Sequence, residues 1–522
     1  MVYLVVKKKA VLFAGHHLQK SMRKFTVLAL SLLTYTGLFS QSCFQKNRYR
    51  EPIFDSIVIT PNVTYAIAPQ LVPTEVLGIK TYDETKFEDV ELKMDIYEPF
   101  DDTLSRRPMI IFMHSGGFLP DYGDRHNDDM IAFCDTFARK GYVTATISYR
   151  LGYDILDSVA ATRAVYRAIQ DGRSAIRFLK EKATTYRIDT NNIFMLGSSA
   201  GAFIALHNAY LNEESERPIE TYEDDDHPDL GALDATGNDY RHAAQAQGIV
   251  SLWGALQDTA LILSDDVRPT LLVHGIDDES VYFEYDHPFG LSTLPKVYGS
   301  HPVYKKLNQL GYDAPHYFVP GEDHEFYGID GGKWENDTPN AYWDTILLAT
   351  TNFIYEQLPK PTAVFSYDSG CPVYFNNESV ELISSCWDFG DNSFSAEFQP
   401  SHTYVTSDTF LVSLSVINYL GIIDNQEQNI YFPKCEANAV SSSDFGKSFQ
   451  IYPNPTSEIL HIDFLDEKNR QLTVFDITGR VILKSFETHT HVKLNVSSLK
   501  AGVYFISVAN GSSADTFKFI KK

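Results

Sequence analysis

The chain has 522 residues, of which 44% are hydrophobic and 21% are charged, with 30 glycines and 23 prolines. This composition is close to that of globular proteins and excludes wholesale disorder, collagen-like repeats and a small disulfide scaffold. At about 150 residues per domain, the length predicts three or four domains. The formal net charge of −24 argues against binding to nucleic acid or to an anionic membrane through a basic patch.

The N-terminal residues have the pattern of a cleavable signal peptide. Met22 and two basic residues precede an uncharged, leucine-rich run over residues 25–42, with small residues just before Cys43. We therefore expect residues 1–42 to direct export, with Met22 as the true start. The apolar segment is shorter than the roughly 20 residues of a membrane helix, so no transmembrane segment is expected in the mature chain.

Between residues 57 and 358, short β-branched runs alternate with segments of helical apolar spacing, which is typical of a mostly parallel sheet flanked by helices. The expected strands are residues 92–97, 109–113, 142–148, 193–196, 248–252, 270–273 and 316–319. The expected helices are residues 158–186, 200–211 and 342–357. We predict one α/β domain over residues 57–358.

A G-x-S-x-G motif follows the predicted strand at residues 193–196. Gly197, Ser199 and Gly201 lie between this strand and a helix-like segment. A serine at a sharp strand-to-helix turn needs small neighbours, and the helix N-terminus stabilises negative charge near it. We predict Ser199 as a nucleophile at this elbow. Ser198 lies one residue too early for the exposed position of the turn.

A serine nucleophile requires a base and an orienting acid, which this fold supplies in the order Ser, Asp or Glu, His. Asp278 follows the predicted strand at residues 270–273, and His324 follows the last predicted strand. His324 is the expected general base. Asp277 competes with Asp278 for the role of acid, because sequence alone does not fix the register of a loop. Three further histidines are expected to be structural or to line the pocket: His274, His301 and His316.

A glycine pair follows the predicted strand at residues 109–113. Glycines allow backbone N–H groups to turn toward a substrate carbonyl, and Gly116 and Gly117 with the N–H of Ala200 are the expected oxyanion hole. Ser115 stands where a further glycine is commoner, which leaves open which amide points inward.

These motifs resemble those of secreted carboxylesterases of the α/β-hydrolase superfamily. The resemblance favours Asp278 over Asp277, because the acid of similar enzymes stands four residues after a His and three before a Val. It implies an ester hydrolase that acts through an acyl-enzyme and needs no metal or organic cofactor. Relatives of this kind often remove acetyl or feruloyl groups from plant polysaccharides. A serine peptidase of the same fold and a non-catalytic surface-binding protein are the alternatives.

Two insertions are expected to lie near the site. Residues 213–239 are strongly acidic and are expected to form a solvated loop rather than a calcium site, because the ligand spacing is irregular. Residues 282–301 are rich in aromatic side chains directly after the loop of the acid. These aromatics suit a sugar or aryl ligand or cover an edge of the core, and the sequence leaves both possibilities open.

Helical spacing ends at a proline-bearing linker around residues 358–362, and residues 362–433 predict a small β-sandwich. The blocks at residues 387–391 and 400–404 resemble the signature of a PKD domain, a module that is more often a spacer than a binder. A disulfide is expected within the group of three cysteines in this region, with its pairing undetermined: Cys371, Cys386 and Cys435.

The last domain is expected at residues 448–522, after a polar linker. The blocks at residues 451–456, 472–480 and 499–504 resemble, in order and spacing, the C-terminal sorting domain of proteins exported by the type IX secretion system. The resemblance implies the outer-membrane secretion machinery as a partner. It also implies a secreted or cell-surface location.

Overall fold

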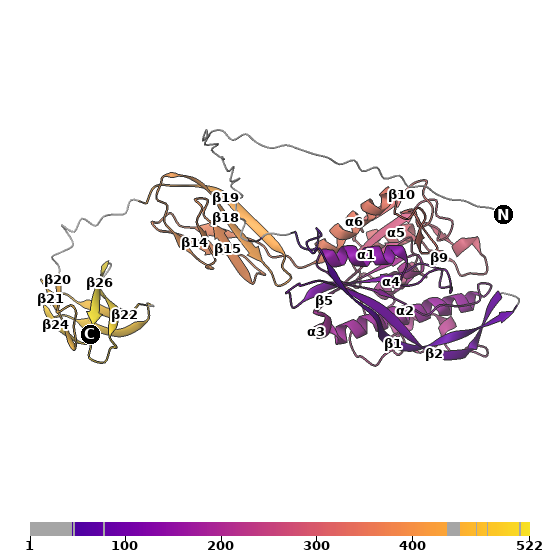
Figure 1. Cartoon of the computed structure of the whole chain (residues 1–522), viewed down its shortest axis with the longest axis horizontal. Helices are drawn as coiled ribbons and strands as arrows, with labels where there is room; N and C mark the ends of the chain where they lie inside the picture. Colours follow the sequence, from indigo (N-terminus) through magenta and orange to yellow (C-terminus); the bar gives the residue numbers. More distant parts are fainter. Residues whose placement is uncertain are drawn as a thin grey trace, which may run out of the picture. The chain divides into compact units, whose positions relative to one another are not determined.

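The computed structural model describes residues 44, 47–76, 79–435, 449–465, 467–477, 479–510 and 513–522. The predicted signal peptide, residues 1–42, lies outside this described part. Within the described part, the last α-helix ends at Gln357 and only strands follow (Figure 1). The structure therefore changes from α/β to all-β after Gln357.

One sheet of eight strands organises the α/β part, in the order β1-β2-β4-β3-β5-β6-β7-β10. Its strands are β1 (Ile57–Val76), β2 (Ile79–Pro99), β3 (Arg107–Met113), β4 (Val143–Ile147), β5 (Ile188–Ser198), β6 (Gly248–Leu252), β7 (Thr270–Gly275) and β10 (His316–Val319). Neighbouring pairs from β4 to β10 are parallel, whereas β2 pairs antiparallel with both β1 and β4. This sheet, with its helices, confirms the predicted α/β-hydrolase fold class.

Helices cover both faces of the sheet. They are α1 (Asp128–Arg139), α2 (Ser158–Glu181), α3 (Ala183–Tyr186), α4 (Ala200–Tyr210), α5 (Ser300–Gln309) and α6 (Ala341–Gln357). Alternate side chains of β3 enter two cores: Ile110 and Phe112 pack with α1 and α6, whereas Met109 and Ile111 pack with α2, α4 and α5. Because both faces are buried, the strands are continuous apolar runs in the sequence.

Short elements lie in the loops of this domain. Two antiparallel hairpins pair β8 (Tyr285–Asp286) with β9 (Val297–Tyr298) and β11 (Ile329–Asp330) with β12 (Lys333–Trp334). Single 3-10 turns occur at η1 (Glu214–Glu216), η2 (Ile219–Thr221), η3 (Thr259–Leu261) and η4 (Pro288–Gly290). These turns occur in the connections after α4, β6 and β7.

The sheet begins with a long antiparallel hairpin that the sequence analysis did not predict. The first expected strand covers residues 92–97, whereas β1 and β2 pair over almost their whole lengths. Pro69 and Pro73 lie within β1, and proline argues against a strand because it cannot donate to the ladder. β1 is an edge strand, so the missing N–H groups do not break the sheet.

Residues 362–433 contain two antiparallel sheets around one core. The sheets are formed by β13 (Phe365–Tyr367), β14 (Val373–Asn377) and β17 (Ser401–His402), and by β16 (Phe394–Ser395), β15 (Ser384–Asp388), β18 (Asp408–Ile417) and β19 (Ile423–Phe432). Trp387 and Tyr404 are fully buried in this core, and the Tyr404 hydroxyl donates to the carbonyl of Phe389 at 3.1 Å. The small all-β fold is therefore present, and its assignment as a PKD domain stays a prediction.

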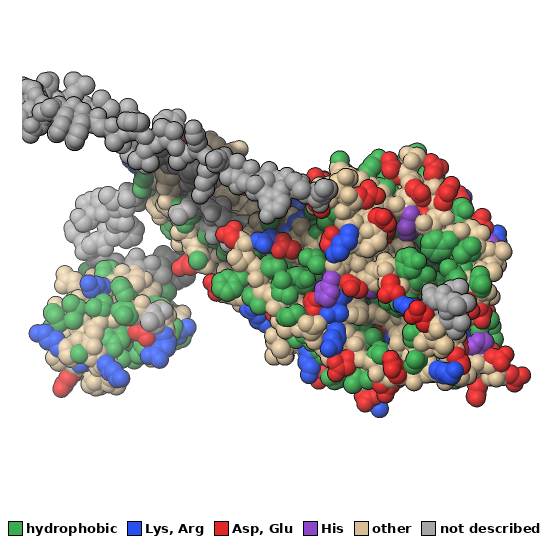
Figure 2. Space-filling model, turned by 45° about the vertical axis from the view of Figure 1, so that its right-hand side comes forward, with side chains coloured by type: hydrophobic (Ala, Val, Ile, Leu, Met, Phe, Trp, Pro, Cys, Tyr) green, Lys and Arg blue, Asp and Glu red, His purple; other side chains and the backbone are tan. Residues whose placement is uncertain are grey.

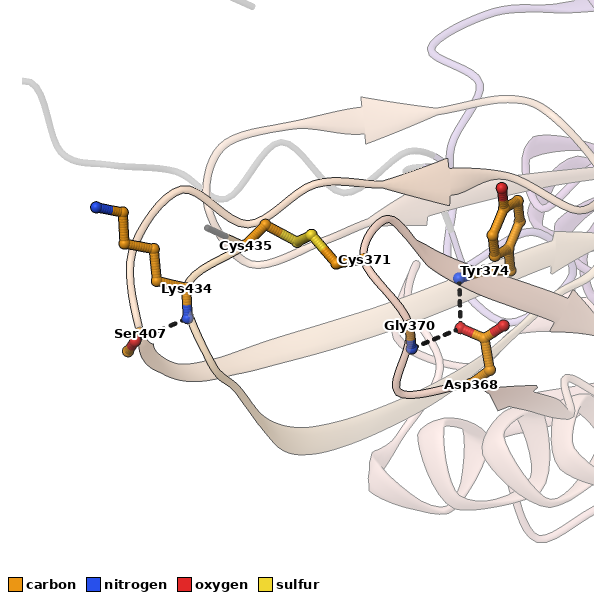
Figure 3. Close-up of a disulfide and its surroundings, with 7 residues drawn as sticks. All are labelled: Asp368, Gly370, Cys371, Tyr374, Ser407, Lys434 and Cys435. Carbon is orange, nitrogen blue, oxygen red and sulfur yellow. Dashed lines mark hydrogen bonds between the residues drawn. A yellow bond between two sulfur atoms is a disulfide. The ribbon is translucent and has the colours of Figure 1, made fainter. Parts of the chain in front are cut away.

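A disulfide closes one end of this β-sandwich (Figure 3). Cys371, in the loop between β13 and β14, is bonded to Cys435, which follows β19. In the same loop, the carboxylate of Asp368 accepts a hydrogen bond from the N–H of Gly370 at 3.0 Å. The structure thus supplies a pairing that the sequence left open, and Cys386 is also disulfide-bonded.

The C-terminal part, within residues 449–522, has a second pair of antiparallel sheets. They are formed by β20 (Phe449–Tyr452), β21 (Ile459–Phe464) and β24 (His491–Asn495), and by β23 (Val481–Glu487), β22 (Arg470–Asp476), β25 (Gly502–Asn510) and β26 (Ser513–Lys521). Leu460, Leu472, Ile506 and Phe519 are buried between them. This part therefore has a core of its own.

The surface has no large basic patch on the face drawn in Figure 2. Acidic and basic side chains are interspersed there, with apolar groups between them. None of the helices in the described residues is long and apolar enough to span a membrane.

Candidate active site

Ser199 occupies a sharp turn between β5 and α4. Its backbone has φ 50° and ψ −114°, in the left-handed half of conformational space that non-glycine residues rarely adopt. Its N–H donates to the carbonyl of Leu252 on the neighbouring strand β6 at 3.0 Å. The strained turn presents the hydroxyl at the end of the central parallel strand, at the N-terminus of α4.

The two glycines of the motif are required by close backbone approach. A Cβ at Gly197 would lie 2.0 Å from the backbone of Gly201, and a Cβ at Gly201 would lie 2.1 Å from the carbonyl oxygen of Met113. Neither neighbour is a flexible side chain that could move aside. The G-x-S-x-G motif therefore needs its two glycines because this turn packs closely against itself and against the end of β3.

His324 and Asp278 lie in line with Ser199. The Nε2 atom of His324 is 2.9 Å from the Ser199 hydroxyl, and its Nδ1 atom is 2.7 Å from the Asp278 carboxylate. Nδ1–H donates to the carboxylate, so Nε2 is left to accept the hydroxyl proton of Ser199. The structure brings these three side chains together from the ends of β5, β7 and β10, which are parallel and end at the same edge of the sheet.

The loop register places Asp278, and not Asp277, against the histidine. Asp278 is 2% exposed and accepts hydrogen bonds from the N–H groups of Ser280 and Val281, both at 2.8 Å. Asp277 is exposed, and its N–H donates to the carbonyl of Glu322 at 3.1 Å. The loops after β7 and β10 are therefore joined through their backbones.

A second histidine contacts the same carboxylate from within the core. His274 is fully buried, and its Nε2 atom lies 3.2 Å from Asp278 and 2.8 Å from the carbonyl of Val281. Its Nδ1 atom lies 2.8 Å from the hydroxyl of Ser300. Nε2 faces two acceptors and is therefore the donor, which leaves Nδ1 to accept from Ser300. His274 thus helps to hold Asp278 in place, in agreement with its expected structural role.

The electrostatics of the site follow from these contacts. Burial opposes the charged form of Asp278, but hydrogen bonds from His274 and His324 hold the pKa of this carboxyl well below its ordinary value. Burial also opposes the charged form of His324, but the hydrogen bond to Asp278 and the negative charges of Asp278, Glu325 and Asp323 raise the pKa of this imidazole. The carboxylate therefore stays ionised and increases the basicity of the histidine.

The loop after β3 lies beside Ser199. Gly116 and Gly117 have φ values of 124° and 58°, and the amides of both glycines donate to no carbonyl within the described residues. The first amide of a helix has no partner inside the helix, so the N–H of Ala200 is also available. Two hydrogen bonds hold this loop in place. The carbonyl of His114 accepts one from the N–H of Gly201 (3.1 Å) and one from the hydroxyl of the buried Tyr149.

A second link, which the sequence did not predict, joins the loop after β10 to the elbow at Ser199. The hydroxyl of Ser198 is 3.3 Å from the carboxylate of Glu325 and accepts a hydrogen bond of 2.9 Å from the indole of Trp253. Trp253 also packs edge-on against His324. Ser198 is therefore buried and structural, as expected, whereas only tertiary structure shows the part played by Glu325 and Trp253.

Two cavities meet at Ser199. The larger has a volume of about 460 Å³ and is lined by His324, Glu325 and Asp330 together with Tyr122. The smaller has a volume of about 60 Å³ and is mostly apolar. Its lining includes Gly117, Phe118, Tyr153, Phe203, Val281 and Leu294.

The aromatic side chains of residues 282–301 are divided between the site and the core. Phe289 lines both cavities at Ser199. Phe283, in contrast, is buried and packs against His274 and Phe318. One aromatic side chain of this insertion therefore borders the site, while another closes the core.

Most acidic side chains of the insertion are exposed, as expected of a solvated loop, and one of them also anchors the insertion to α2. Asp234 forms ion pairs with Arg173 (2.8 Å) and Arg177 (2.6 Å), two largely buried arginines of α2. The sequence did not predict this anchoring, because the pairs link residues about 60 positions apart in the chain. Within the described residues, no group of three or more His, Cys, Asp or Glu side chains is arranged to hold a metal ion.

Comparison with protein families identifies two segments of the chain. Residues 94–257 match the BD-FAE family model, a segment that includes the glycine loop and Ser199 and ends before Asp278 and His324. Residues 450–522 match the model described as a secretion system C-terminal sorting domain. The predicted resemblance to an esterase followed by a sorting domain is confirmed, and the sorting domain indicates export.

Known proteins give local similarities. The chain is 31% identical over 96 residues to gut esterase 1 of Caenorhabditis briggsae, and 29% identical over 150 residues to phenmedipham hydrolase of Pseudarthrobacter oxydans. These matches cover 18% and 28% of this chain and span only 17% and 28% of the two relatives. The apo form of Thermogutta terrifontis esterase 2 is 20% identical, with a TM-score of 0.38, over 56% of this chain and 97% of that structure.

Proposed function

We propose that the protein is a secreted serine-dependent carboxylic ester hydrolase that acts through an acyl-enzyme. The observation that supports this most strongly is the hydrogen-bonded chain from Asp278 through His324 to Ser199, at the meeting point of two cavities. A serine becomes a nucleophile only when an adjacent base removes its proton. The contacts of His324 are those of such a base.

In the proposed mechanism, His324 removes the proton of the Ser199 hydroxyl through Nε2 as the serine oxygen attacks the ester carbonyl. Asp278 keeps the imidazole oriented and stabilises its positive charge without taking up the proton. His324 then returns the proton to the leaving alcohol. A water molecule, deprotonated by the same nitrogen, attacks the acyl-enzyme and releases the acid.

The negative charge on the carbonyl oxygen requires donors. We assign this role to the N–H groups of Ala200, Gly116 and Gly117, which lie beside Ser199 and lack backbone acceptors within the described residues. Such preorganised donors stabilise the tetrahedral intermediate, and the loss of one typically costs about 10²–10³-fold in rate. The positive φ values of both glycines explain why side chains are not favoured there.

Each of the two cavities is proposed to hold one part of the substrate. The leaving oxygen must lie within reach of His324 to receive its proton, and His324 lines only the larger cavity. We therefore assign the alcohol to the larger cavity and the acyl group to the smaller, apolar one. About 10–15 Å³ holds one water-sized group, so about 60 Å³ holds a short acyl chain.

The proposed natural substrate is an ester of acetyl or feruloyl groups on a polysaccharide. The small acyl cavity favours acetyl, because a feruloyl group is far larger than the space beside Ser199. The larger cavity, bordered by Tyr122, Glu325 and Asp330, offers an aromatic surface and hydrogen-bond acceptors to sugar hydroxyls. It contains no lysine or arginine, so a neutral alcohol fits it better than an anionic one.

The proposed domain organisation combines export signals with a catalytic domain and a spacer. Residues 1–42 would act as the signal peptide, residues 57–358 as the catalytic domain and residues 362–433 as a PKD-like spacer. Residues 448–522 would be recognised by the type IX secretion machinery. The mature enzyme is then released or held at the cell surface.

The test is a set of initial rates for the purified chain on short, medium and aryl acyl esters, on acetylated and feruloylated xylan and on peptide amides. Ser199→Ala is the matched variant, because it removes only the hydroxyl. We expect hydrolysis of short esters that the variant lacks. Amide hydrolysis without ester hydrolysis would favour a peptidase, and equal rates of both proteins would refute the proposed enzyme.

A further inference from the structure

The acyl cavity ends at a wall with a second cavity behind it. The second cavity has a volume of about 40 Å³ and is lined on its far side by Tyr166, Ile169 and His207. Four residues line both cavities, which makes them the partition: Val165, Phe203, Pro295 and Val297. Neither Ser199 nor His324 lines the second cavity, so it takes no part in the chemistry described above.

Phe203 is the largest side chain of this partition. It lies one helical turn after Ser199 on α4 and is 6% exposed. Its ring packs edge-on against Phe118, and the two centroids are 6.1 Å apart. Because α4 begins at the nucleophile, the helix that fixes Ser199 also fixes the depth at which Phe203 closes the acyl cavity.

His207, which lines the second cavity, has hydrogen-bond partners at both ring nitrogens. His207 is buried, its Nδ1 atom is 2.8 Å from the carbonyl of Phe203, and its Nε2 atom accepts from the N–H of Gln257 at 3.2 Å. Burial lowers the pKa of His207 to about 4, so the ring is neutral. The far wall also includes Thr162, Gln257 and Lys296, and the ammonium of Lys296 is paired with Asp286 at 3.2 Å. The lining surface is nevertheless mostly apolar, so the space suits hydrocarbon.

We propose that Phe203, with Val165, sets the upper limit of acyl-chain length, and that the second cavity accepts the end of a longer acyl chain once this partition is reduced. The inference rests on the proposed ester hydrolysis and on the assignment of the acyl group to the smaller cavity. At about 10–15 Å³ per group, the first cavity holds about four to six carbons and the second about three more. The wild-type protein is thus limited to acyl groups of about six carbons, and an opened variant would accept octanoyl groups.

The experiment compares kcat/KM on p-nitrophenyl acetate, butyrate, hexanoate and octanoate. Each additional buried methylene favours the longer ester by about fourfold, so two or three methylenes give about 15- to 60-fold. We expect Phe203→Ala to raise the octanoate-to-acetate ratio by this amount over wild type. Val165→Ala, a smaller truncation that leaves α4 unchanged, should raise the ratio by less.

Phe178→Ala is the matched control. Phe178 lies in the same core, is 7% exposed and lines neither cavity, so its truncation disturbs packing without opening the partition. We expect it to keep the wild-type chain-length preference. Titration with an organophosphate counts the competent sites in each variant and corrects the absolute kcat/KM values for partial unfolding. The octanoate-to-acetate ratio does not depend on this fraction.

The two possible failures are distinguishable. If wild type hydrolyses none of the four esters, the proposed function is wrong. If wild type hydrolyses acetate and butyrate but both partition variants keep its octanoate-to-acetate ratio, the proposed function stands and the inference is wrong. If Phe178→Ala raised the octanoate-to-acetate ratio as much as Phe203→Ala, the inference would also be contradicted, because loosened packing would then explain the effect.

Discussion

Two regions of the molecule each bring a histidine to the carboxylate of Asp278, and only one of them can act as a base. His324, in the loop after β10, faces a cavity and the hydroxyl of Ser199. His274, near the end of β7, is enclosed and directs its other ring nitrogen at Ser300. In the proposed mechanism, the partner of the second ring nitrogen therefore decides the role of each histidine.

Replacement of His324 is expected to have the largest effect. His324→Ala removes the base, and kcat for a short ester should fall about 10⁴- to 10⁶-fold. Steady-state rates on p-nitrophenyl acetate measure this, with circular dichroism as a check of folding. A loss of less than tenfold in a folded variant would contradict the role assigned to this histidine.

Replacement of the shared carboxylate is expected to come next. Asp278→Asn keeps the size of the side chain but removes its charge. The amide no longer favours the tautomer of His324 that carries its proton on Nδ1, so kcat should fall about 10⁴-fold. Asp277→Asn is the matched control one residue away, and its kcat should stay close to that of wild type because Asp277 is exposed. Equal losses in the two variants would argue against the loop register described above.

Replacement of His274 should affect stability as well as rate. His274→Ala leaves buried acceptors without a donor, which should lower the free energy of unfolding by about 1–3 kcal/mol. Asp278 keeps its contacts with His324 and two backbone amides. We therefore expect kcat to fall only about tenfold, the equivalent of about 1.4 kcal/mol. Urea unfolding and kcat of the same preparations test both expectations.

The pH dependence should show the smallest effect. His324 must be neutral to act as a base, so kcat/KM should fall as the pH drops below its pKa, which lies above the ordinary value of 6.5. Glu325→Gln removes a negative charge that helps to raise this pKa. The acid limb of the profile should therefore move to lower pH. An unchanged or opposite shift would show that Glu325 does not act on His324.

The sequence predicts the parts of this site that depend on local structure. The elbow at Ser199 follows from its two glycines, and the positions of His324 and Asp278 follow from the order of strands that end at one edge of the sheet. The fold class follows from the alternation of strands and helices. The long hairpin of β1 and β2 does not, because prolines in an edge strand obscure it.

The remaining parts depend on contacts between residues that are distant in the chain. The link from Ser198 to Glu325 joins residues 127 positions apart, and no local pattern indicates it. Phe203 was visible only as an apolar residue of a helix, and its place between two cavities depends on α2 and on the loop of β9. The pairing of Cys371 with Cys435 likewise required the fold.

The central claim, that Ser199 is the nucleophile activated by His324, is tested most directly by covalent trapping. The full chain is treated with paraoxon, and the phosphorylated peptide is located by mass spectrometry. We expect one modification on Ser199 that is absent from Ser199→Ala and much slower to form in His324→Ala. Modification of another residue, or ester hydrolysis that survives in Ser199→Ala, would contradict the account.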